Sequence, residues 1–179
     1  MKKHFMCDCD NCPLKDAVYV PTSGPENADI IFVVESPGKT EETTQIPLTG
    51  RAGQELDKIL EEIELDRSLI RVINTCNCHS TKNGKDAPPP DTAIECCSKR
   101  LNAEIRFADP KIVVAFGKTA TKALTGLDRA VRDTCGNAYP WKVNPNIKIL
   151  CTYHPSAMLH RDRNKIYDQI KEDLLKTKC

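Results

Sequence analysis

Short apolar runs, two of them interrupted by one basic residue, recur along the chain and alternate with segments in which apolar residues return at helical spacing. The runs are rich in β-branched residues, and they are Ile30 to Val34, Leu69 to Ile73, Ile112 to Phe116 and Ile147 to Cys151. Runs of this kind are typical of strands that are buried on both faces, as in a parallel sheet. We therefore expect four strands.

The segments between the runs have the pattern of amphipathic helices. From about Arg51 to Leu65 the apolar side chains fall on one helical face. Further helices are expected up to Ala108 after a cap at Asp91 or Thr92, over residues 117–124, and around Ile166, Ile170 and Leu174. Residues 76–90, which end in three prolines, are expected to form a loop. This alternation predicts an α/β fold, a single three-layer α/β/α domain over residues 1–179 with a mainly parallel four-stranded sheet.

Polar side chains follow three of the expected strands. Glu35 follows the first strand, Asn74 the second, and His154 lies just beyond the last. Each has an ordinary alternative: a solvated glutamate at the start of a surface loop, an amide that satisfies a loop backbone, and a turn histidine before Pro155. The carboxyl ends of parallel strands meet at one edge of a sheet, where α/β proteins build their sites. The shared position therefore predicts a common cleft.

Length and charge limit the classes of function. A chain of 179 residues is long enough for one well-buried domain and short for two. The formal net charge is +1, so any contact with nucleic acid must come from a local patch. No apolar stretch is long enough to cross a membrane, and the N-terminus lacks a signal-peptide core. We expect a cytoplasmic protein without a membrane partner.

Ten cysteines require an explanation, because a reducing compartment argues against a disulfide framework. Cys9 and Cys12 have the Cys-x2-Cys spacing of a chelating pair. Two doublets, Cys76/Cys78 and Cys96/Cys97, flank the proline-rich loop. One thiolate from each doublet would complete a four-sulfur site, which either zinc or an iron–sulfur cluster accepts.

Four stretches resemble motifs of the iron–sulfur (family 4) uracil-DNA glycosylases. Val34 to Glu41 resembles the motif Gly-Glu-x-Pro-Gly-x-x-Glu, and Pro47 to Gly53 resembles Pro-Phe-x-Gly-x-Ala-Gly. Asn74 followed by Cys78 is similar to Asn-x3-Cys, and His154 to Leu159 is similar to His-Pro-Ser-x-x-Leu. The likeness extends from Cys9 to the last helix. It implies a monomeric DNA-repair enzyme that hydrolyses the N-glycosidic bond of uracil in single- or double-stranded DNA, without a covalent intermediate.

The resemblance also implies a role for each matched residue. His154 would stabilise negative charge on uracil O2, Glu35 would place or activate the attacking water, and Asn74 would read the flipped base. The remaining substrate-binding candidates surround the base, and they are Leu48, Ser36, Pro37, Gly38 and Glu41. Lys39, Arg161 and Arg163 would meet DNA phosphates. Cys9, Cys12, Cys78 and Cys97 would hold a [4Fe–4S] cluster, with zinc as the alternative metal and with Cys7, Cys76 and Cys96 as alternative ligands.

Two positions depart from the family pattern. Val34 replaces a glycine, and Leu48 replaces the phenylalanine that stacks on uracil. An aliphatic side chain forfeits the aromatic contribution, roughly 0.5–1.5 kcal/mol. The alternatives are weaker activity, a glycosylase for another damaged base, a non-catalytic DNA-binding module, or a metal-binding enzyme on other nucleobases. A zinc deaminase is disfavoured, because no His-x-Glu precedes Cys9.

Overall fold

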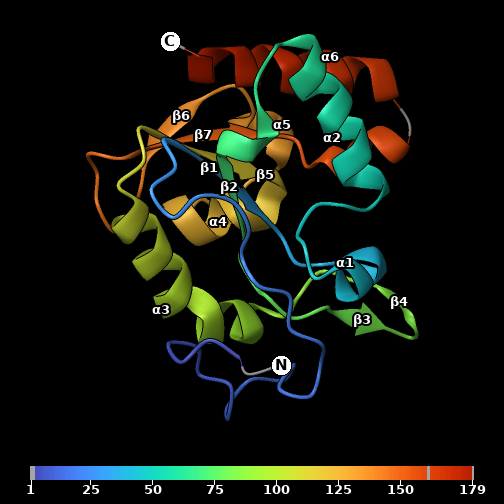
Figure 1. Ribbon diagram of the computed structural model, residues 1–179, viewed down its shortest axis with the longest axis vertical. Helices are drawn as coiled ribbons and strands as arrows, with labels where there is room; N and C mark the ends of the chain where they lie inside the picture. The colour runs from blue at the N-terminus through green and yellow to red at the C-terminus, as the bar shows by residue number, and fades with distance from the viewer. Residues whose placement is uncertain (1–2, 161, 179) are drawn as a thin grey trace.

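The computed structural model describes residues 3–160 and 162–178, and a twisted central sheet runs through its middle (Figure 1). Within these residues the sheet has five strands in the order β2-β1-β5-β7-β6. Their bounds are β1 (Ile30–Val34), β2 (Ile70–Asn74), β5 (Ile112–Phe116), β6 (Ala138–Pro140) and β7 (Lys148–Thr152). The first four named in the order are parallel, and β6 pairs antiparallel with β7. The mainly parallel sheet is confirmed, but its predicted number of four strands is wrong, because the short edge strand β6 was missed.

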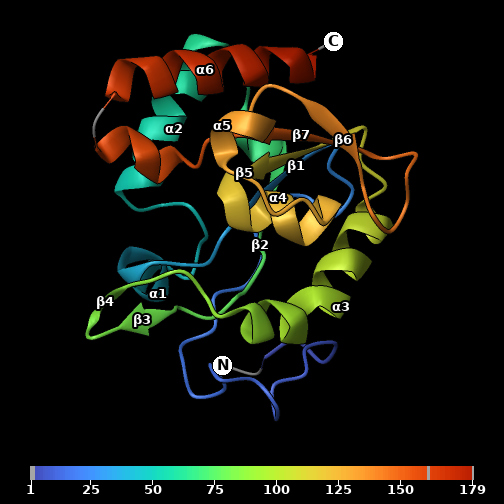
Figure 2. The ribbon, with the colours of Figure 1, turned by 180° about the vertical axis from the view of Figure 1, so that it is seen from behind.

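Helices cover both faces of the sheet (Figures 1 and 2). Side chains alternate along β1, so that Phe32 and Val34 join one apolar cluster while Ile31 and Val33 join the other. The first cluster includes residues of α2 (Arg51–Glu62) and α6 (Arg163–Leu175). The second includes residues of α3 (Asp91–Ala108) and α4 (Gly117–Thr125). This is the predicted three-layer arrangement.

The register of the sheet brings the polar strand ends to one edge. Val34 lies opposite Asn74 in the parallel pair of β1 and β2. Phe116 at the end of β5 lies opposite Thr152 at the end of β7. Glu35, Asn74 and His154 therefore leave the sheet on the same side.

Several short elements lie outside the predicted pattern. Residues 76–90, expected to be a loop, contain a hairpin of β3 (Thr81–Lys82) and β4 (Lys85–Asp86). Asn83 and Gly84 both have positive φ, 54° and 72°, as a two-residue hairpin turn requires. The other additions are α1 (Lys39–Thr44), α5 (Val131–Thr134) and the 3-10 turns η1 (Arg67–Leu69), η2 (Pro155–Leu159) and η3 (Lys176–Lys178).

The segment before β1 packs beside the first turns of α3, where Figure 1 shows it in blue. The Asp8 amide donates to the carbonyl of Cys96 (2.9 Å), and the Val20 amide donates to that of Asn77 (2.8 Å). No helix in the described part of the chain combines the length and the apolar composition that crossing a membrane requires. The prediction of one domain over residues 1–179 is not tested and stays a prediction.

Candidate active site and cysteine cluster

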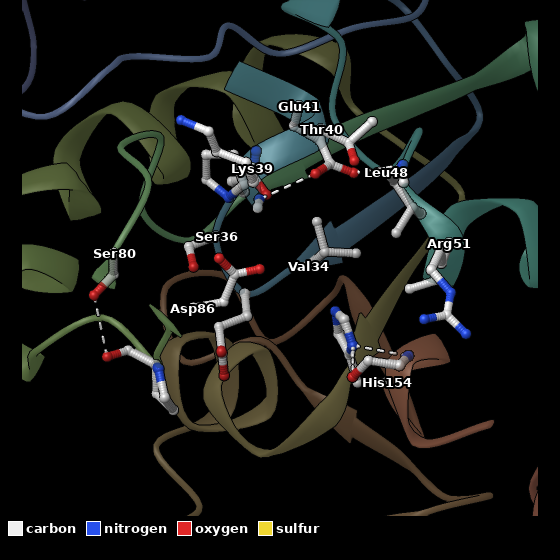
Figure 3. Close-up of a pocket in the computed structure, with 18 of the residues that line it drawn as sticks. Val34, Ser36, Lys39, Thr40, Glu41, Leu48, Arg51, Ser80, Asp86 and His154 are labelled. Carbon is white, nitrogen blue, oxygen red and sulfur yellow. Dashed lines mark hydrogen bonds between the residues drawn. The ribbon is translucent and has the colours of Figure 1, made fainter. Parts of the chain in front are cut away.

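A cavity of about 380 Å³ lies at the edge of the sheet where β1 and β2 end (Figure 3). Its walls come from the turn after β1, from α1, from the turn before α2, from the β3–β4 hairpin and from η2. Predicted site residues that line it are Glu35, Ser36, Pro37, Gly38, Lys39, Glu41, Leu48, Asn74 and His154. The structure thus brings together residues that are up to about 120 positions apart in sequence.

His154 precedes η2 and is held by the backbone that follows it. Its Nδ1 accepts the backbone N–H of Ser156 (3.2 Å) and lies 2.8 Å from the Ser156 hydroxyl oxygen. Burial lowers the pKa of His154 to about 4, against a smaller opposing effect of Glu41. A neutral imidazole that accepts at Nδ1 carries its proton on Nε2. His154 therefore offers one neutral N–H donor at the cavity.

The first turn of α4 contacts both predicted catalytic residues. The Thr119 hydroxyl donates to the Glu35 carboxylate. Gly117 has a positive φ of 82°, and a Cβ there would lie 3.0 Å from the Cβ of His154. Thr119 was not predicted as a site residue. Its one sequence signal is its position three residues after the strand that ends at Phe116.

Asn74 presents an unpaired amide in the cavity wall. The residue is 1% exposed, and within the described residues its Nδ2 has no hydrogen-bond partner. Its backbone carbonyl accepts a hydrogen bond from Arg100 (2.7 Å). Leaving a buried donor unpaired costs about 1–3 kcal/mol. A ligand with an acceptor at this position would remove that cost.

Glu41 supports the cavity wall through its carboxylate. The carboxylate accepts backbone N–H groups of Gly38 (3.1 Å), Thr49 (3.0 Å) and Gly50 (2.7 Å). These bonds join the turn after β1 to the turn before α2. The prediction that Glu41 also contacts the substrate stays a prediction.

Leu48 and Val34, the two departures from the family pattern, belong to the same apolar cluster. Leu48 is 7% exposed and has a left-handed backbone with φ 60°. Its carbonyl accepts a hydrogen bond from Arg67 Nη2 (2.7 Å). Figure 3 shows Leu48 and His154 on opposite sides of the cavity. The backbone thus fixes the position of the side chain that takes the place of the stacking phenylalanine.

A histidine that the sequence analysis did not single out fastens the hairpin to α1. His79 is 6% exposed, and its Nδ1 lies 2.8 Å from Glu42 Oε1. Its Nε2 lies 2.8 Å from Asp86 Oδ1 at the end of β4. Asp86 lines the cavity, so these contacts place the hairpin as part of the wall.

The two predicted phosphate contacts that the structure describes, Lys39 and Arg163, lie in different places. Lys39 lines the cavity and pairs with Glu42 (2.8 Å), and Arg163 on α6 pairs with Glu55 (2.5 Å). The prediction for Arg161 lies outside the described residues. Arg51, the first residue of α2, lines the cavity and was not predicted.

Six cysteines from three segments form one packed cluster beside α3. Cys12, Cys76, Cys78 and Cys97 are its buried members, and Cys7 and Cys96 pack against them. Burial is the largest cause that raises the pKa of Cys9 and of Cys78, and charge on Cys97 and Cys12 raises both further. The four predicted ligands therefore lie within electrostatic reach of one another.

The alternative ligands contact the predicted ones. Hydrogen bonds from Cys7 and Cys76 lower the pKa of Cys97, while a hydrogen bond between Cys96 and Cys12 contributes to raising the pKa of Cys96, after burial and the charge of Cys12. The choice between the predicted and the alternative ligands therefore stays a prediction.

The chemistry of this cluster fits a group held by sulfur. Between Cys76 and Cys78, Asn77 is fully buried, and among the described residues neither its Nδ2 nor its Oδ1 has a hydrogen-bond partner. A thiolate-held group would offer acceptors to that buried amide. In the described ranges, no three His, Cys, Asp or Glu side chains form a group that could hold a metal ion. The fit therefore rests on the chemistry of the cysteine sulfurs and not on a metal-binding geometry.

Residues 21–175 match the family described as the Uracil DNA glycosylase superfamily. The chain is 31% identical over 173 residues to the type-4 uracil-DNA glycosylase of Thermotoga maritima, covering 95% of this chain and 88% of that protein. The type-4 enzyme of Sulfurisphaera tokodaii is 31% identical, with coverage of 88% and 74%. That of Archaeoglobus fulgidus is 30% identical, with coverage of 86% and 79%.

Proposed function

The chain belongs to the uracil-DNA glycosylase superfamily, and from this membership we propose that it is a DNA-repair hydrolase that removes uracil from DNA. It cleaves the N-glycosidic bond and leaves an abasic site. The observation that carries the mechanism is the cavity in which His154, Asn74 and Glu35 meet at one sheet edge. Because a base inside a duplex is out of reach, the uracil is turned out of the stack into this cavity.

Asn74 selects the base in this proposal. Its Nδ2, unpaired within the described residues, donates to uracil O4, and its Oδ1 accepts the N3–H. Cytosine carries an amino group at the first position and an acceptor at the second, so both contacts are lost. A site built to hydrogen-bond one pattern rejects the other because its buried polar groups stay unpaired. Leu48 packs on the ring, and the turn of Ser36, Pro37 and Gly38 lies beside it.

His154 and Glu35 act on the reacting atoms. As the C1′–N1 bond breaks, the bonding electrons move onto uracil, and its O2 gains negative charge. The Nε2–H of His154 donates to O2, a bond that strengthens in the transition state. Glu35, held by Thr119, orients water toward C1′ and faces the oxocarbenium-like sugar. Water adds to C1′, its proton passes to the carboxylate or solvent, and uracil leaves as an anion.

We also propose that Cys9, Cys12, Cys78 and Cys97 hold a [4Fe–4S] cluster, with zinc as the alternative. When bound, the group supplies a crosslink between the N-terminal segment, the loop after β2 and α3, together with local negative charge. Lys39, Arg163 and Arg161 are proposed phosphate contacts, although Lys39 and Arg163 must exchange their carboxylate partners for DNA. We further propose that the protein is a monomer and that it acts in the cytoplasm.

The test is single-turnover release of uracil from an oligonucleotide, with DNA affinity measured separately. We expect His154→Ala to lower the rate by ~10²–10³, as loss of one donor to a developing oxyanion does. DNA affinity should change little, because uracil O2 is neutral in the ground state. His160→Ala is the control, since His160 is exposed and lies outside the cavity lining.

The same assay separates the alternatives. If wild type and His154→Ala are equally inert on every uracil context while both bind DNA, the protein is a binding module. Asn74→Ala should narrow the difference between the rates at which uracil and cytosine are released. Leu48→Phe should raise the rate or leave it unchanged if the missing aromatic contact limits activity.

A further inference from the structure

Arg100 connects the cysteine cluster to the base-reading end of the cavity. It lies on α3 three residues after Cys97, so the two side chains leave neighbouring positions of the helix surface. The side chain of Arg100 is fully buried. Its Nη2 donates to the backbone carbonyl of Asn74 (2.7 Å) and lies 3.4 Å from that of Thr75. One guanidinium thus reaches the residue proposed to read uracil.

The buried charge of Arg100 has a weak carboxylate partner. Glu104 Oε1 lies 3.4 Å from Nη1, and the other oxygen of Glu104 pairs with Arg71 (3.2 Å). Nε of Arg100 has no hydrogen-bond partner in the described part of the chain. A buried cation is expensive unless an anion balances it. Glu104, shared between two arginines, supplies only part of that balance.

The cysteine cluster is placed to supply the rest, because Cys97, one of its buried members, lies one helical turn before Arg100 on α3. Burial lowers the pKa of Arg100, but charge on Glu104, then on Cys97 and on Cys7, outweighs it and raises the pKa overall. Four thiolates around a [4Fe–4S] group would give that cluster a net negative charge, which a nearby guanidinium would balance. Arg100 thus lies one helical turn from a proposed cluster ligand, and its guanidinium donates to the carbonyl of Asn74.

We propose that Arg100 is a positioning residue that balances the charge of the thiolate-held group and fixes Asn74 for uracil recognition. The inference rests on the proposed function and deepens it, because it gives the cysteine cluster a role in base selection. Removing the cation should disfavour the added electron of the reduced cluster and make its reduction potential more negative. Removing the donor should loosen Asn74 and weaken discrimination between uracil and cytosine.

The experiment compares Arg100→Met and Arg100→Lys with Arg71→Met in the iron-loaded protein. Arg71→Met is the matched control, because it removes the other cation on Glu104, and within the described residues the other partners of Arg71 are the carbonyls of Gly24 and Pro25. The measurements are iron and sulfide content, the reduction potential by spectroscopic titration, and single-turnover release of uracil. Competition by cytosine-containing DNA reports discrimination.

We expect Arg100→Met to have a more negative reduction potential. We also expect it to release uracil about tenfold more slowly, because it loses one charge-assisted hydrogen bond. Arg100→Lys should keep the wild-type potential and recover only part of the rate, because an ammonium lacks the planar fork. Arg71→Met should match wild type in both. A merely structural residue would not separate potential from rate in this way.

Three results would overturn the inference. They are a folded Arg100→Met protein with the wild-type potential, one with the wild-type rate and discrimination, and a wild-type protein that carries no iron. If Arg100→Met does not fold, Arg100→Lys decides: an unchanged potential with slower release supports the inference, and any other result overturns it. A wild type that holds iron but releases no uracil contradicts the proposed function, while the potential still tests the role of Arg100.

Discussion

At the scale of single residues, the position of one proton on His154 determines what the cavity can do. Nδ1 is occupied by the Ser156 backbone, so the neutral ring donates from Nε2. Burial keeps the ring neutral by lowering its pKa from 6.5 to about 4. A neutral donor is a suitable partner for a uracil anion, because it stabilises the charge without needing a counter-ion for itself in the free enzyme.

This protonation state predicts how pH affects activity and stability. Because the pKa of His154 is lower in the folded protein, its active neutral form persists between about pH 5 and 8, and uracil release should show no step near 6.5 from this group. The unfolded chain binds more protons between pH 6.5 and about 4, so the contribution of His154 to stability is complete above 6.5 and falls as pH decreases. Single-turnover rates and denaturant midpoints across this range test both.

The matching variant for the stability measurement is His154→Ala. It should lose less stability than wild type as the pH falls through the same window. The neutral-donor assignment would be contradicted if the wild-type rate of uracil release fell with an apparent pKa near 6.5 and the rate of His154→Ala did not.

Sequence reasoning located the polar strand ends but not all of their partners. Glu35, Asn74 and His154 could be predicted to meet, because parallel strands align their carboxyl ends. Thr119 could not, because its contact with Glu35 spans 84 residues and a threonine near a helix start has many common uses. Arg100 was missed for a related reason, since a helical arginine is usually solvated and only the structure shows this one to be buried.

At the scale of elements, the main strands and long helices could be predicted and the short elements could not. The helix α1 has six residues and is preceded by the N-cap Gly38, whose amide donates to the Glu41 carboxylate. A helix that short depends on such contacts more than on propensity. The hairpin did carry a signal, Asn83-Gly84, which the loop prediction overlooked. The three-residue strand β6 contains Pro140 and pairs only at the sheet edge, where strand patterns are weakest.

The turn before α2 provides the prediction at this scale, through Gly53. A Cβ at Gly53 would lie 1.8 Å from the carbonyl oxygen of Leu48, so alanine cannot fit without moving the turn or the helix. Gly53→Ala should therefore lower the midpoint of thermal unfolding, although alanine favours a helix by about 1 kcal/mol over glycine. It should also slow uracil release by displacing Leu48.

The control for Gly53→Ala is Gln54→Ala, an exposed neighbour on the same helix. That variant should keep the wild-type midpoint and rate. If Gly53→Ala is as stable and as active as Gln54→Ala, the close approach of α2 to Leu48 does not set the shape of the cavity.

At the scale of the whole molecule, two parts of the protein have different sources of stability. The sheet and its helices bury two large apolar clusters. The segment before β1 contributes to a small cluster made mostly of cysteines. A net charge of +1 adds little long-range attraction to DNA, so we expect DNA binding to depend on local contacts around the cavity. In our proposal, the cysteine cluster holds the N-terminal segment against the loop after β2, and Arg100 links that loop to Asn74.

That dependence leads to the last prediction, which concerns the bound group itself. Anaerobically purified protein should be brown and contain iron and acid-labile sulfide, and Cys78→Ser should lose both. Because a metal group that joins separate segments contributes directly to folding, and a whole domain is stable by only about 5–15 kcal/mol, Cys78→Ser should unfold at a clearly lower denaturant concentration. Cys135→Ser is the control, since Cys135 lies near Asp173, where a serine hydroxyl can also donate (3.5 Å from Sγ to Oδ2).

Cys76→Ser should retain iron if Cys78 is the ligand of its doublet. Colourless wild-type protein with stoichiometric zinc would replace the iron–sulfur assignment with zinc, and iron lost from Cys76→Ser but kept by Cys78→Ser would exchange the two ligands.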